Sequence, residues 1–459
     1  MNRAYLGIDI GTSSVKVICR YDNGETQKAR MKYDEISPEG WYNAVIKALS
    51  ELDLSAVAAI GLSSQVGTYI IDENEVIMWN DSIGKTELDE VRASYEPEVF
   101  IDEISMPHPQ IASYPIPRLK YIQKNKGNRR RVCQPKDYVG ERLTGRLATD
   151  KYSWRGLANF ESCHYSERFL SEVGYPKLPP IIMPTEMLGT VRENVAKAVG
   201  LPLNTPVFTG LNDFFASLMG MGIFERGNMF DITGTSEHLG VICEDISPDT
   251  NMVSGPYLYD YVHYGVTASS GAALDFGIDN FELKKLSLNK DIIRSAPVFC
   301  PYLKGERAPI FDGNASGTFL GIDSDCTKEM LAYSVLEGVA FSIYHIYELL
   351  GTPRAESLRV SGGAAKDTNL NLLKATLFSV PVTVLEEEDT SALGAAMVAA
   401  VGIGAFSDEK SAAKAFCRIK GVIMPDDSLR ELLLKRYEVY KKIYPALKDT
   451  YGKFKEVQL

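Results

Sequence analysis

Short apolar runs and helical repeats alternate along the whole chain. Residues 5–17 and 229–241 share one pattern, in which an apolar strand leads through a Gly/Thr/Ser turn into a second apolar strand. Between them, a helical pattern covers 41–52, a buried strand covers 58–62, and 68–79 reads as a hairpin. Strands that alternate with helices favour α/β layers over an all-helical or all-β fold.

The second half continues this alternation. Residues 328–350 predict a long helix with one apolar face, which ends at Gly351. The elements predicted after it are a strand at 358–361, helix 367–379, strand 382–385, helix 391–401 and a final amphipathic helix through Leu429 and Tyr444. Because 391–401 consists largely of alanine and glycine, we expect its backbone to press closely against a neighbour. By contrast, 94–118 is rich in proline and polar residues and is expected to run over the surface of the first half.

The chain predicts two domains. Its 459 residues exceed what one hydrophobic core serves. A buried strand at 204–210 leads into Asp213 and a helix of small residues that starts at Phe214. Because the second copy of the hairpin starts soon afterwards, we place the junction near Ile223. This predicts an N-terminal domain at 1–222 and a C-terminal domain at 223–459, joined by a hinge.

Charge and composition narrow the class of protein. The formal net charge of -11 argues against a nucleic-acid-binding surface, which needs clustered positive charge. The basic run at 129–131 fits a solvated loop, and the seven cysteines form no CxxC pair, which favours reduced thiols. No apolar run approaches the roughly 20 residues of a membrane span. The chain begins directly with a strand pattern, so we expect a cytoplasmic protein without nucleic-acid or membrane partners.

The two Gly/Thr/Ser turns are the first candidates for chemistry. In such turns glycine lets the backbone approach a ligand, while N–H groups and hydroxyls point at it. Asp9 lies beside the first turn, where a carboxylate would repel phosphate unless Mg²⁺ lay between them. The repeat therefore predicts two related halves that hold one magnesium-bound polyphosphate. Two ordinary β-hairpins with shared turn chemistry are the structural alternative.

Asp213 is the sharpest candidate for catalysis. It follows a strand that ends in Thr-Gly and precedes a helix, so its carboxylate is expected at the positive end of a helix dipole, which favours the ionised form. An ionised aspartate can accept the proton of a substrate hydroxyl as that hydroxyl attacks a phosphoryl group. Capping of the helix N-terminus is the alternative role for this residue.

A pair of glycines, Gly362 and Gly363, lies between a predicted strand and a predicted helix. It would let a nucleotide lie against bare backbone, although many α/β turns contain paired glycines for structural reasons. The chain contains no GxxxxGK[ST] sequence, and no GxGxxG follows its first strand. Neither a P-loop enzyme nor a simple dinucleotide-binding protein is therefore supported.

Taken in order, these segments resemble the FGGY carbohydrate kinases, within the actin and Hsp70-like ATPase superfamily. The string at 9–16 is similar to the family's first phosphate loop, and 210–213 lies where the family carries its catalytic aspartate. Pro-Tyr-Leu-Lys-Gly-Glu-Arg-Ala-Pro at 301–309 is the most specific single string. The other matching segments are 61–65, 78–81, 135–138, 143–145, 234–236 and 361–364.

The resemblance implies an α/β fold of two ribonuclease H-like domains, of the actin/Hsp70 ATPase type, with a cleft between them. It implies phosphorylation of a sugar or polyol hydroxyl by ATP with Mg²⁺, in a cleft that closes to exclude water. Asp213 would be the general base and Asp9 would act on the metal. The residues implied to hold the nucleotide are Gly11, Thr12, Ser13, Lys16, Gly234, Thr235, Ser236, Gly362, Gly363 and Asp367. The residues implied to hold the sugar are Gln65, Trp79, Asn80, Asp81 and Asp213.

The substrate-side segments look most like the xylulokinase and gluconokinase branches. The Trp79 ring would lie against sugar C–H groups, although a core tryptophan that ends a hairpin is the alternative. Xylulokinases usually carry Met-His-Gly after the equivalent of Gln65 and Asn after the catalytic aspartate, whereas here 66–68 read Val-Gly-Thr and Phe214 follows Asp213. Because both changes remove polar groups, we expect a pentulose-like substrate but xylulose itself to be a poor one. Gluconate, glycerol and tetritols are the alternatives.

Two non-enzymatic alternatives belong to the same superfamily. A chaperone-like ATPase would keep both phosphate loops and bind a protein, and a sugar-sensing pseudokinase would bind without turnover. The sugar-side segment at 79–81 argues against the first, and the acidic pair Asp9 and Asp213 argues against the second. A kinase of this kind could form a homodimer.

Overall fold

The computed structural model describes residues 2–246 and 252–458, which form two compact units. The first unit comprises Met1–Phe224, Gly255–Leu258 and Asp389–Arg418, and the second comprises Glu225–Ser254, Tyr259–Glu388 and Ile419–Leu459. These units differ from the predicted domains 1–222 and 223–459 because the chain returns to the first unit late in the sequence. The returning segment carries the helix of small residues predicted at 391–401.

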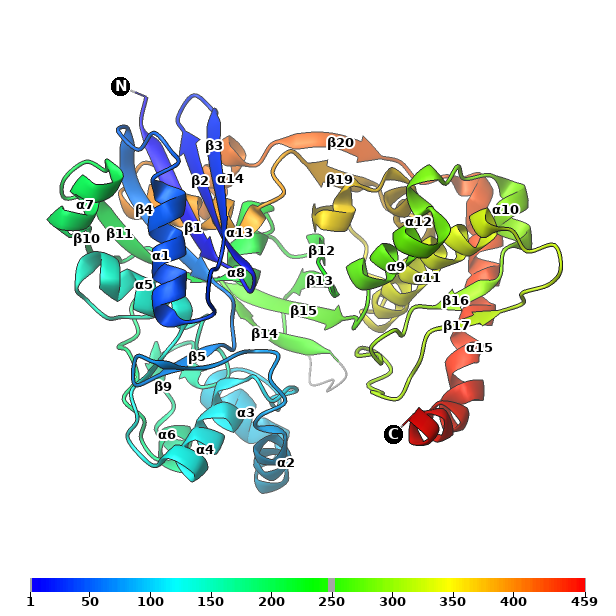
Figure 1. The fold of residues 1–459 in the computed structure, drawn as a ribbon, viewed down its shortest axis with the longest axis horizontal. Coiled ribbons are helices and arrows are strands. Elements are labelled where there is room, and N and C mark those ends of the chain that lie inside the picture. The colour runs from blue at the N-terminus through cyan, green and yellow to red at the C-terminus, as the bar shows by residue number, and fades with distance from the viewer. Residues whose placement is uncertain (1, 247–251, 459) are drawn as a thin grey trace. The chain divides into compact units, whose positions relative to one another are not determined.

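A six-stranded sheet lies at the centre of the first unit (Figure 1). Its strands, in spatial order, are β10 (Met187–Thr190), β11 (Pro206–Asn212), β4 (Val57–Ser64), β1 (Ala4–Ile10), β2 (Ser14–Tyr21) and β3 (Thr26–Lys32). β1 and β2 form the predicted antiparallel hairpin, whereas β1, β4 and β11 run parallel. The carboxyl ends of these three parallel strands therefore meet at one edge of the sheet.

Helices cover both faces of this sheet. In Figure 1, α1 (Pro38–Leu49) stands in front of it and α13 (Thr390–Gly402) lies behind it. α13 approaches so closely that a Cβ on Gly7 in β1 would lie 1.8 Å from the carbonyl oxygen of Ala392, and one on Gly61 in β4 would lie 1.9 Å from that of Ala395. The predicted close packing of this helix is confirmed. It also explains why residues 389–418 belong to the first unit.

The predicted surface excursion at 94–118 is wrong in part, because the segment contains helices. α3 (Pro97–Ile104) lies within it, and α4 (Pro115–Lys126) begins near its end. Pro97 and Pro115 each stand at the start of a helix, where the missing N–H has no intrahelical partner to lose. Prolines that marked loops in the sequence pattern therefore start helices. Phe100 and Ile116 pack these helices into a buried apolar cluster.

The remaining elements of the first unit surround this cluster and the sheet. The predicted hairpin at 68–79 forms β5 and β6, which pair with β7 in a small sheet. These elements are β5 (Tyr69–Ile71), β6 (Glu75–Ile77), β7 (Val132–Cys133), β8 (Ala158–Asn159), β9 (His164–Tyr165), α2 (Lys85–Ser94), α5 (Pro135–Thr144), α6 (Glu167–Glu172), α7 (Glu193–Val199), α8 (Asp213–Gly220) and α14 (Glu409–Phe416).

A second sheet lies at the centre of the second unit. Its order is β14-β15-β13-β12-β18-β19-β20. The bounds are β14 (Val253–Tyr257), β15 (Asp260–Val266), β13 (Glu237–Cys243), β12 (Met229–Thr233), β18 (Leu358–Gly362), β19 (Val382–Leu385) and β20 (Ile419–Ile423). β12 and β13 form the second predicted hairpin, and β18 runs parallel to β12. This pairing brings the Gly/Thr/Ser turn after β12 next to the glycine pair after β18.

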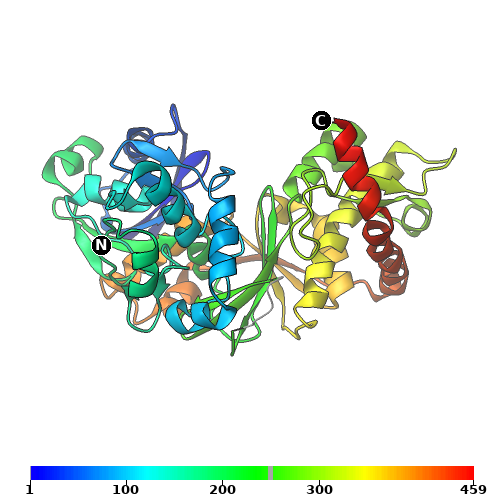
Figure 2. The ribbon, with the colours of Figure 1, turned by 90° about the horizontal axis from the view of Figure 1, so that it is seen from below.

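The long helices predicted for this unit are confirmed. The unit contains α9 (Gly271–Phe281), α10 (Lys290–Ser295), α11 (Lys328–Leu349), α12 (Thr368–Phe378), α15 (Asp427–Gln458), β16 (Val298–Cys300) and β17 (Thr318–Leu320). α15, the red helix in Figure 2, packs against α10, α11 and α12. Its apolar face, which includes Leu433, Tyr437 and Tyr440, is buried in the core of the unit, so this face packs the fold rather than a partner.

Candidate active site

Acidic and polar residues gather at the carboxyl ends of the parallel strands of the first unit. Asp9 lies near the end of β1, Gln65 follows β4, and Asp213 follows β11. The strand register places Ile10 opposite Ser64, and Ser64 opposite Asn212. Residues that are far apart in the sequence are therefore brought to one edge of one sheet.

Asp9 is buried, and hydroxyl groups hold both of its carboxylate oxygens. Ser63 Oγ donates to Asp9 Oδ1 at 3.0 Å, and Ser391 Oγ donates to Oδ2 at 2.6 Å. Two hydroxyl donors leave part of the acceptor capacity of a carboxylate unused. Asp9 is thus oriented without an ion-pair partner among the residues that the structure describes.

Lys16 and Asp389 form an ion pair next to this carboxylate. Lys16 lies opposite Asp9 in the β1–β2 hairpin, and its Nζ is 3.2 Å from Asp389 Oδ1. Asp389 and Ser391 stand at the start of α13. Neither residue can be recognised as part of the site from the sequence, because no spacing rule connects them with residues near the N-terminus.

Asp213 does not cap helix α8. Asn212 is the N-cap residue, and its side chain accepts a hydrogen bond from the backbone N–H of Phe215 at 3.1 Å. Asp213 begins the helix, and its Oδ1 accepts a bond from the N–H of Phe214 at 2.8 Å. The capping role is therefore filled by its neighbour, and the half-buried carboxyl of Asp213 is left for another task.

Burial and charge raise the pKa of Asp213 to about 7. Loss of hydration contributes most, followed by the negative charge of Asp9, while the Phe214 N–H and Lys16 act in the opposite direction. This corrects the expectation that the helix start would favour the ionised form, since desolvation outweighs the first-turn N–H groups. A carboxyl with a pKa near neutrality is well suited to accept a proton from a substrate hydroxyl.

The first Gly/Thr/Ser turn presents exposed hydroxyls. Gly11 donates its N–H to the carbonyl of Ser14, and the Tyr33 hydroxyl donates to the Gly11 carbonyl at 2.7 Å. These bonds fix the backbone of the turn, while the side chains of Thr12 and Ser13 are exposed. The turn therefore has a fixed backbone and two accessible hydroxyl groups.

The predicted sugar-side residues form a firmly held turn at 78–81. Trp79 is half-buried, so it is not a core tryptophan, and its indole Nε1 donates to Thr12 Oγ1 at 3.0 Å. Asn80 is exposed. Asp81 is also exposed, but its Oδ2 accepts a bond from the N–H of Met78 at 2.7 Å, so part of its role is to shape the turn.

Gln65 is buried, and neither polar atom of its amide has a partner among the described residues. Its backbone N–H donates to the carbonyl of Ile10 at 3.0 Å, which fixes its position between β4 and the first turn. A buried amide without partners costs about 1–3 kcal/mol for each unsatisfied group. Such a group fits a side chain that acquires partners when a ligand binds.

The second unit brings together the second turn and the glycine pair. Thr233 Oγ1 donates to the carbonyl of Ser361 at 2.7 Å. Gly362 has a φ of 90° and lies so close to β12 that a Cβ would be 2.0 Å from the Thr233 carbonyl oxygen. A Cβ on Gly363, by contrast, would meet nothing within 4 Å. The backbone at Gly363 is thus open to a ligand. Asp367 caps α12 by accepting from the N–H of Leu370.

The two hairpins differ in their acidic residues. Asp231 in the second hairpin is one residue further from its turn than Asp9 is from the first, because Thr233 is inserted. Asp231 is buried with Lys374, whose Nζ lies 2.5 Å from Asp231 Oδ2 and also contacts Glu237. Burial raises the pKa of Asp231 strongly, and the neighbouring Glu237 adds to that rise. This acid is therefore part of a core ion cluster rather than of a metal site.

The most specific string of the sequence, at 301–309, serves the fold of the second unit. Glu306 is buried, and its Oε1 accepts bonds from the N–H groups of Ala268 and Arg307 at 2.6 and 2.8 Å. Ser342 in α11 donates to Oε2 at 3.3 Å. Burial raises the pKa of Glu306 to about 7. The acid links three segments of this unit.

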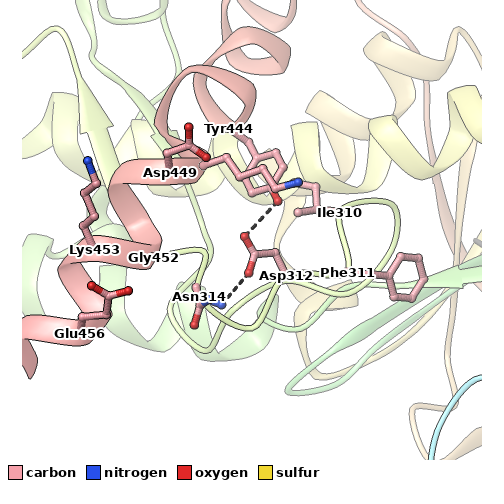
Figure 3. Close-up of a pocket in the computed structure, with 10 residues that line it drawn as sticks. Ile310, Phe311, Asp312, Asn314, Tyr444, Asp449, Gly452, Lys453 and Glu456 are labelled. Carbon is pink, nitrogen blue, oxygen red and sulfur yellow. Dashed lines mark hydrogen bonds between the residues drawn. The ribbon is translucent and has the colours of Figure 1, made fainter. Parts of the chain in front are cut away.

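One cavity of about 600 Å³ lies in the second unit. It is open and mostly polar, and Figure 3 shows residues of the loop at 310–314 and of α15 around it. Tyr444 closes one side by donating to Asp312 Oδ2 at 2.9 Å. None of the predicted site residues lines this cavity, and nothing in it indicates a ligand.

The residues present fit a magnesium ion that is bound together with a nucleotide. Among the described residues, no group of three or more His, Cys, Asp and Glu side chains is arranged to hold a metal. Mg²⁺ does not need such a cage, because it keeps several waters and is bound by one or two carboxylates and the phosphates of the substrate. Asp9, with unused acceptor capacity beside the first turn, suits that part.

No helix within 2–246 and 252–458 combines the length and apolar character that crossing a bilayer requires.

Comparison with known proteins gives matches along nearly the whole chain. The N-terminal domain of the FGGY family of carbohydrate kinases matches residues 4–220, and its C-terminal domain matches residues 230–403. The chain is 28% identical to a xylulose kinase of Staphylococcus epidermidis, over 97% of each protein. It is 26% identical to the structure of a "xyloylose kinase" from Brucella ovis, with a TM-score of 0.85 over 98% of this chain and 100% of that one.

A gluconate kinase from Lactobacillus acidophilus shares the fold at a TM-score of 0.85 and 23% identity, over 99% of this chain and 100% of that one. The two domain matches occur in the order that the resemblance predicted, and together they cover well over half of the residues. This chain therefore belongs to the FGGY family of carbohydrate kinases.

Proposed function

We propose that this sugar kinase transfers the γ-phosphate of ATP to a hydroxyl of a ketopentose, with Asp213 as the general base. The observation that carries the proposal is the Asp213 carboxyl, which lies at the carboxyl edge of the sheet near Asp9 and has a pKa of about 7. Family membership makes the protein a carbohydrate kinase, and use of ATP follows from that class. The xylulose kinases that match the full chain support a ketopentose as the acceptor.

Each step of the transfer has a residue suited to it in the first unit. Asp213 accepts the proton of the attacking hydroxyl, and the N–H of Phe214 keeps the carboxyl in one orientation. Lys16, held by Asp389, presents a positive charge to the phosphate oxygens. Mg²⁺ at Asp9 would neutralise the charge that develops on the transferred group. Ser63 and Ser391 hold Asp9 in the orientation for this task.

Groups suited to a nucleotide also lie in the second unit. The hydroxyls of Thr235 and Ser236 follow β12, and the open backbone at Gly363 allows a nucleoside to approach without a side chain in the way. Asp367 uses one oxygen to cap α12 and keeps its other oxygen for a ribose hydroxyl. These assignments extend the family resemblance to single residues.

The sugar would bind through Gln65, Trp79, Asn80 and Asp81. The indole ring of Trp79 offers an apolar face for C–H groups, and the unpartnered amide of Gln65 offers one acceptor and two donors for hydroxyls. Phe215, one of two aromatic residues after the base, stacks on Tyr257 with ring centroids 5.4 Å apart and is buried. Phe214, which stands where xylulokinases usually carry Asn, is half-buried and offers the sugar no hydrogen-bonding group. Gluconate, glycerol and tetritols are not favoured as substrates.

A substrate panel tests this proposal. ADP release is measured with ATP and Mg²⁺ in the presence of xylulose, ribulose, gluconate, glycerol and erythritol, and without any acceptor. The proposal predicts the largest stimulation by a ketopentose. The panel also tests the expectation, drawn from the Val-Gly-Thr run at 66–68 and from Phe214 after Asp213, that xylulose itself is a poor substrate. No stimulation by any sugar, with intact ATP binding, would support a sensor instead.

A cytoplasmic location and a homodimer also remain part of the proposal. Cell fractionation and size-exclusion chromatography with light scattering test them.

A further inference from the structure

A hydrogen bond joins the sugar-side turn to the first phosphate loop. The indole Nε1 of Trp79 donates to the hydroxyl oxygen of Thr12 at 3.0 Å. These residues lie 67 positions apart in the sequence, within the same unit. Trp79 is one of the residues proposed to contact the sugar, and Thr12 is one of those proposed to contact phosphate. The contact therefore connects two parts of the site that serve different substrates.

Several hydrogen bonds hold the turn that carries this tryptophan. The buried guanidinium of Arg118 donates through Nη2 to three carbonyls of one turn, those of Met78 at 3.1 Å, Trp79 at 3.3 Å and Asp81 at 2.8 Å. The N–H of Trp79 donates to Thr68 Oγ1 at 3.1 Å.

Arg118 forms no ion pair with a carboxylate among the described residues, and its Nε and Nη1 have no acceptor there. A buried charge without a counter-ion is costly, so its contribution lies in the geometry of the turn.

The direction of the indole bond determines what Thr12 can do. A threonine hydroxyl has one donor hydrogen and two acceptor lone pairs. Because the oxygen accepts from the indole, its own hydrogen is left free to donate. Thr12 is exposed in the turn, so this hydrogen is available to a phosphate oxygen. A sugar that contacts the indole ring can thus affect the donor that meets the phosphate.

We propose that Trp79 is a positioning residue that couples sugar binding to the first phosphate loop, by holding the Thr12 hydroxyl as a donor for ATP. Arg118 fixes the turn from which Trp79 acts. This inference rests on the proposed function, since it assigns the sugar to one side of the indole and phosphate to Thr12. It adds that the two substrates communicate through a single side-chain contact within the first unit.

Intrinsic fluorescence tests the contact without relying on turnover. The chain has three tryptophans. Trp41 and Trp154 are fully buried, and their indole N–H groups have no acceptor among the described residues, so Trp79 is the tryptophan that responds to its surroundings. The Trp79→Phe variant supplies the background spectrum of the other two. Thr12→Val removes the acceptor with little change in size, and we expect it to shift the emission of Trp79 before any ligand is added.

Binding of a non-hydrolysable ATP analogue with Mg²⁺ extends this test. The wild-type emission should change on binding, and the change should be lost in Thr12→Val although the analogue still binds by calorimetry. Equal changes in both proteins would contradict the coupling. So would an unliganded Thr12→Val spectrum identical to that of the wild type. Because no sugar is present, these outcomes are independent of whether a ketopentose is the acceptor.

A double-mutant cycle measures the coupling in catalysis. Trp79→Phe and Thr12→Val should each lower kcat/KM for ATP by about 3- to 10-fold, the effect of one lost hydrogen bond, and the double variant should be no worse than either single one. Trp79→Phe keeps an aromatic ring and should leave the KM for the sugar within about 3-fold. Multiplicative losses in the double variant, or a loss confined to the sugar KM, would overturn the proposal.

Discussion

Replacement of Asp213 by asparagine should have opposite effects on activity and stability. Asparagine keeps the size of the side chain, and its carbonyl oxygen can still accept from the N–H of Phe214. It cannot accept a proton from the sugar hydroxyl, so turnover should fall by about 10²- to 10⁴-fold while ATP binding is kept. The same change removes the cost of placing a negative charge beside Asp9 in a poorly hydrated position.

The pKa of Asp213 sets the size of the stability gain and its pH dependence. Its rise from 3.8 to about 7 corresponds to at most ~4 kcal/mol, and the partial exposure of the carboxyl reduces this figure. Below about pH 4 the carboxyl is protonated in both the folded and unfolded states, so it contributes no difference. From there to pH 7 the unfolded state ionises first, and the folded wild type loses stability as the pH rises.

Urea unfolding of both proteins at pH 4, 6 and 8 measures this difference. The variant should gain stability relative to the wild type as the pH rises, with the full gain above pH 7. In the wild type, kcat/KM, which reports the free enzyme, should rise with pH around 7 as the base loses its proton, because only the ionised form can accept one. A variant that is no more stable at pH 8 than at pH 4, relative to wild type, would refute the assigned environment of Asp213. Full activity in the variant would refute its role.

Three further changes test other parts of the account. Lys374→Met leaves Asp231 and Glu237 buried without a cation, so it should lower the free energy of unfolding in urea by about 3–5 kcal/mol. The triple variant that combines Lys374→Met with Asp231→Asn and Glu237→Gln should regain most of this loss. Gly61→Ala should destabilise the first unit by at least about 1–3 kcal/mol and lower its melting temperature, because the new Cβ would meet the Ala395 carbonyl. The control Gly452→Ala in α15, where a Cβ meets nothing within 4 Å, should not lower the melting temperature. Ser391→Ala removes the hydroxyl that donates to Asp9 and should raise the Mg²⁺ concentration for half-maximal rate by about 3- to 10-fold. An unchanged Mg²⁺ dependence would contradict the role of Asp9 as a metal ligand.

Much of the fold could be predicted because local patterns and packing agree in this chain. The hairpins at 5–17 and 229–241 and the helices at 328–350 and 391–401 have strong periodicity, and the structure contains all four. The sequence pattern does not predict the helices within 94–118, because proline is typical of loops but is also well tolerated in the first turn of a helix. The return of 389–418 to the first unit was also missed, since no local pattern encodes which sheet a helix packs against.

Several residues that the sequence proposes for the site lie together in the structure, and their roles stay predictions. Asp9, Thr12, Trp79 and Asp213 belong to one unit, and hydrogen bonds or charge connect them in pairs. Their supporting residues were not predictable, because Ser391 meets Asp9 across 382 positions and Arg118 meets the turn at 78–81 across about 40. The direction of the Asp213 pKa was wrong for a related reason. A helix dipole can be read from the sequence, but desolvation depends on what the folded chain places around the carboxyl.

Phosphorus NMR of a single reaction mixture tests the central claim most directly. ATP, Mg²⁺ and a ketopentose are incubated with the wild type or with Asp213→Asn, and the γ-phosphate signal is followed. With the wild type, we expect a sugar phosphate ester to grow in step with ADP, with little inorganic phosphate, and with the variant we expect neither within the same time. Formation of inorganic phosphate without an ester, or an equal ester signal from the variant, would contradict transfer to a sugar through Asp213.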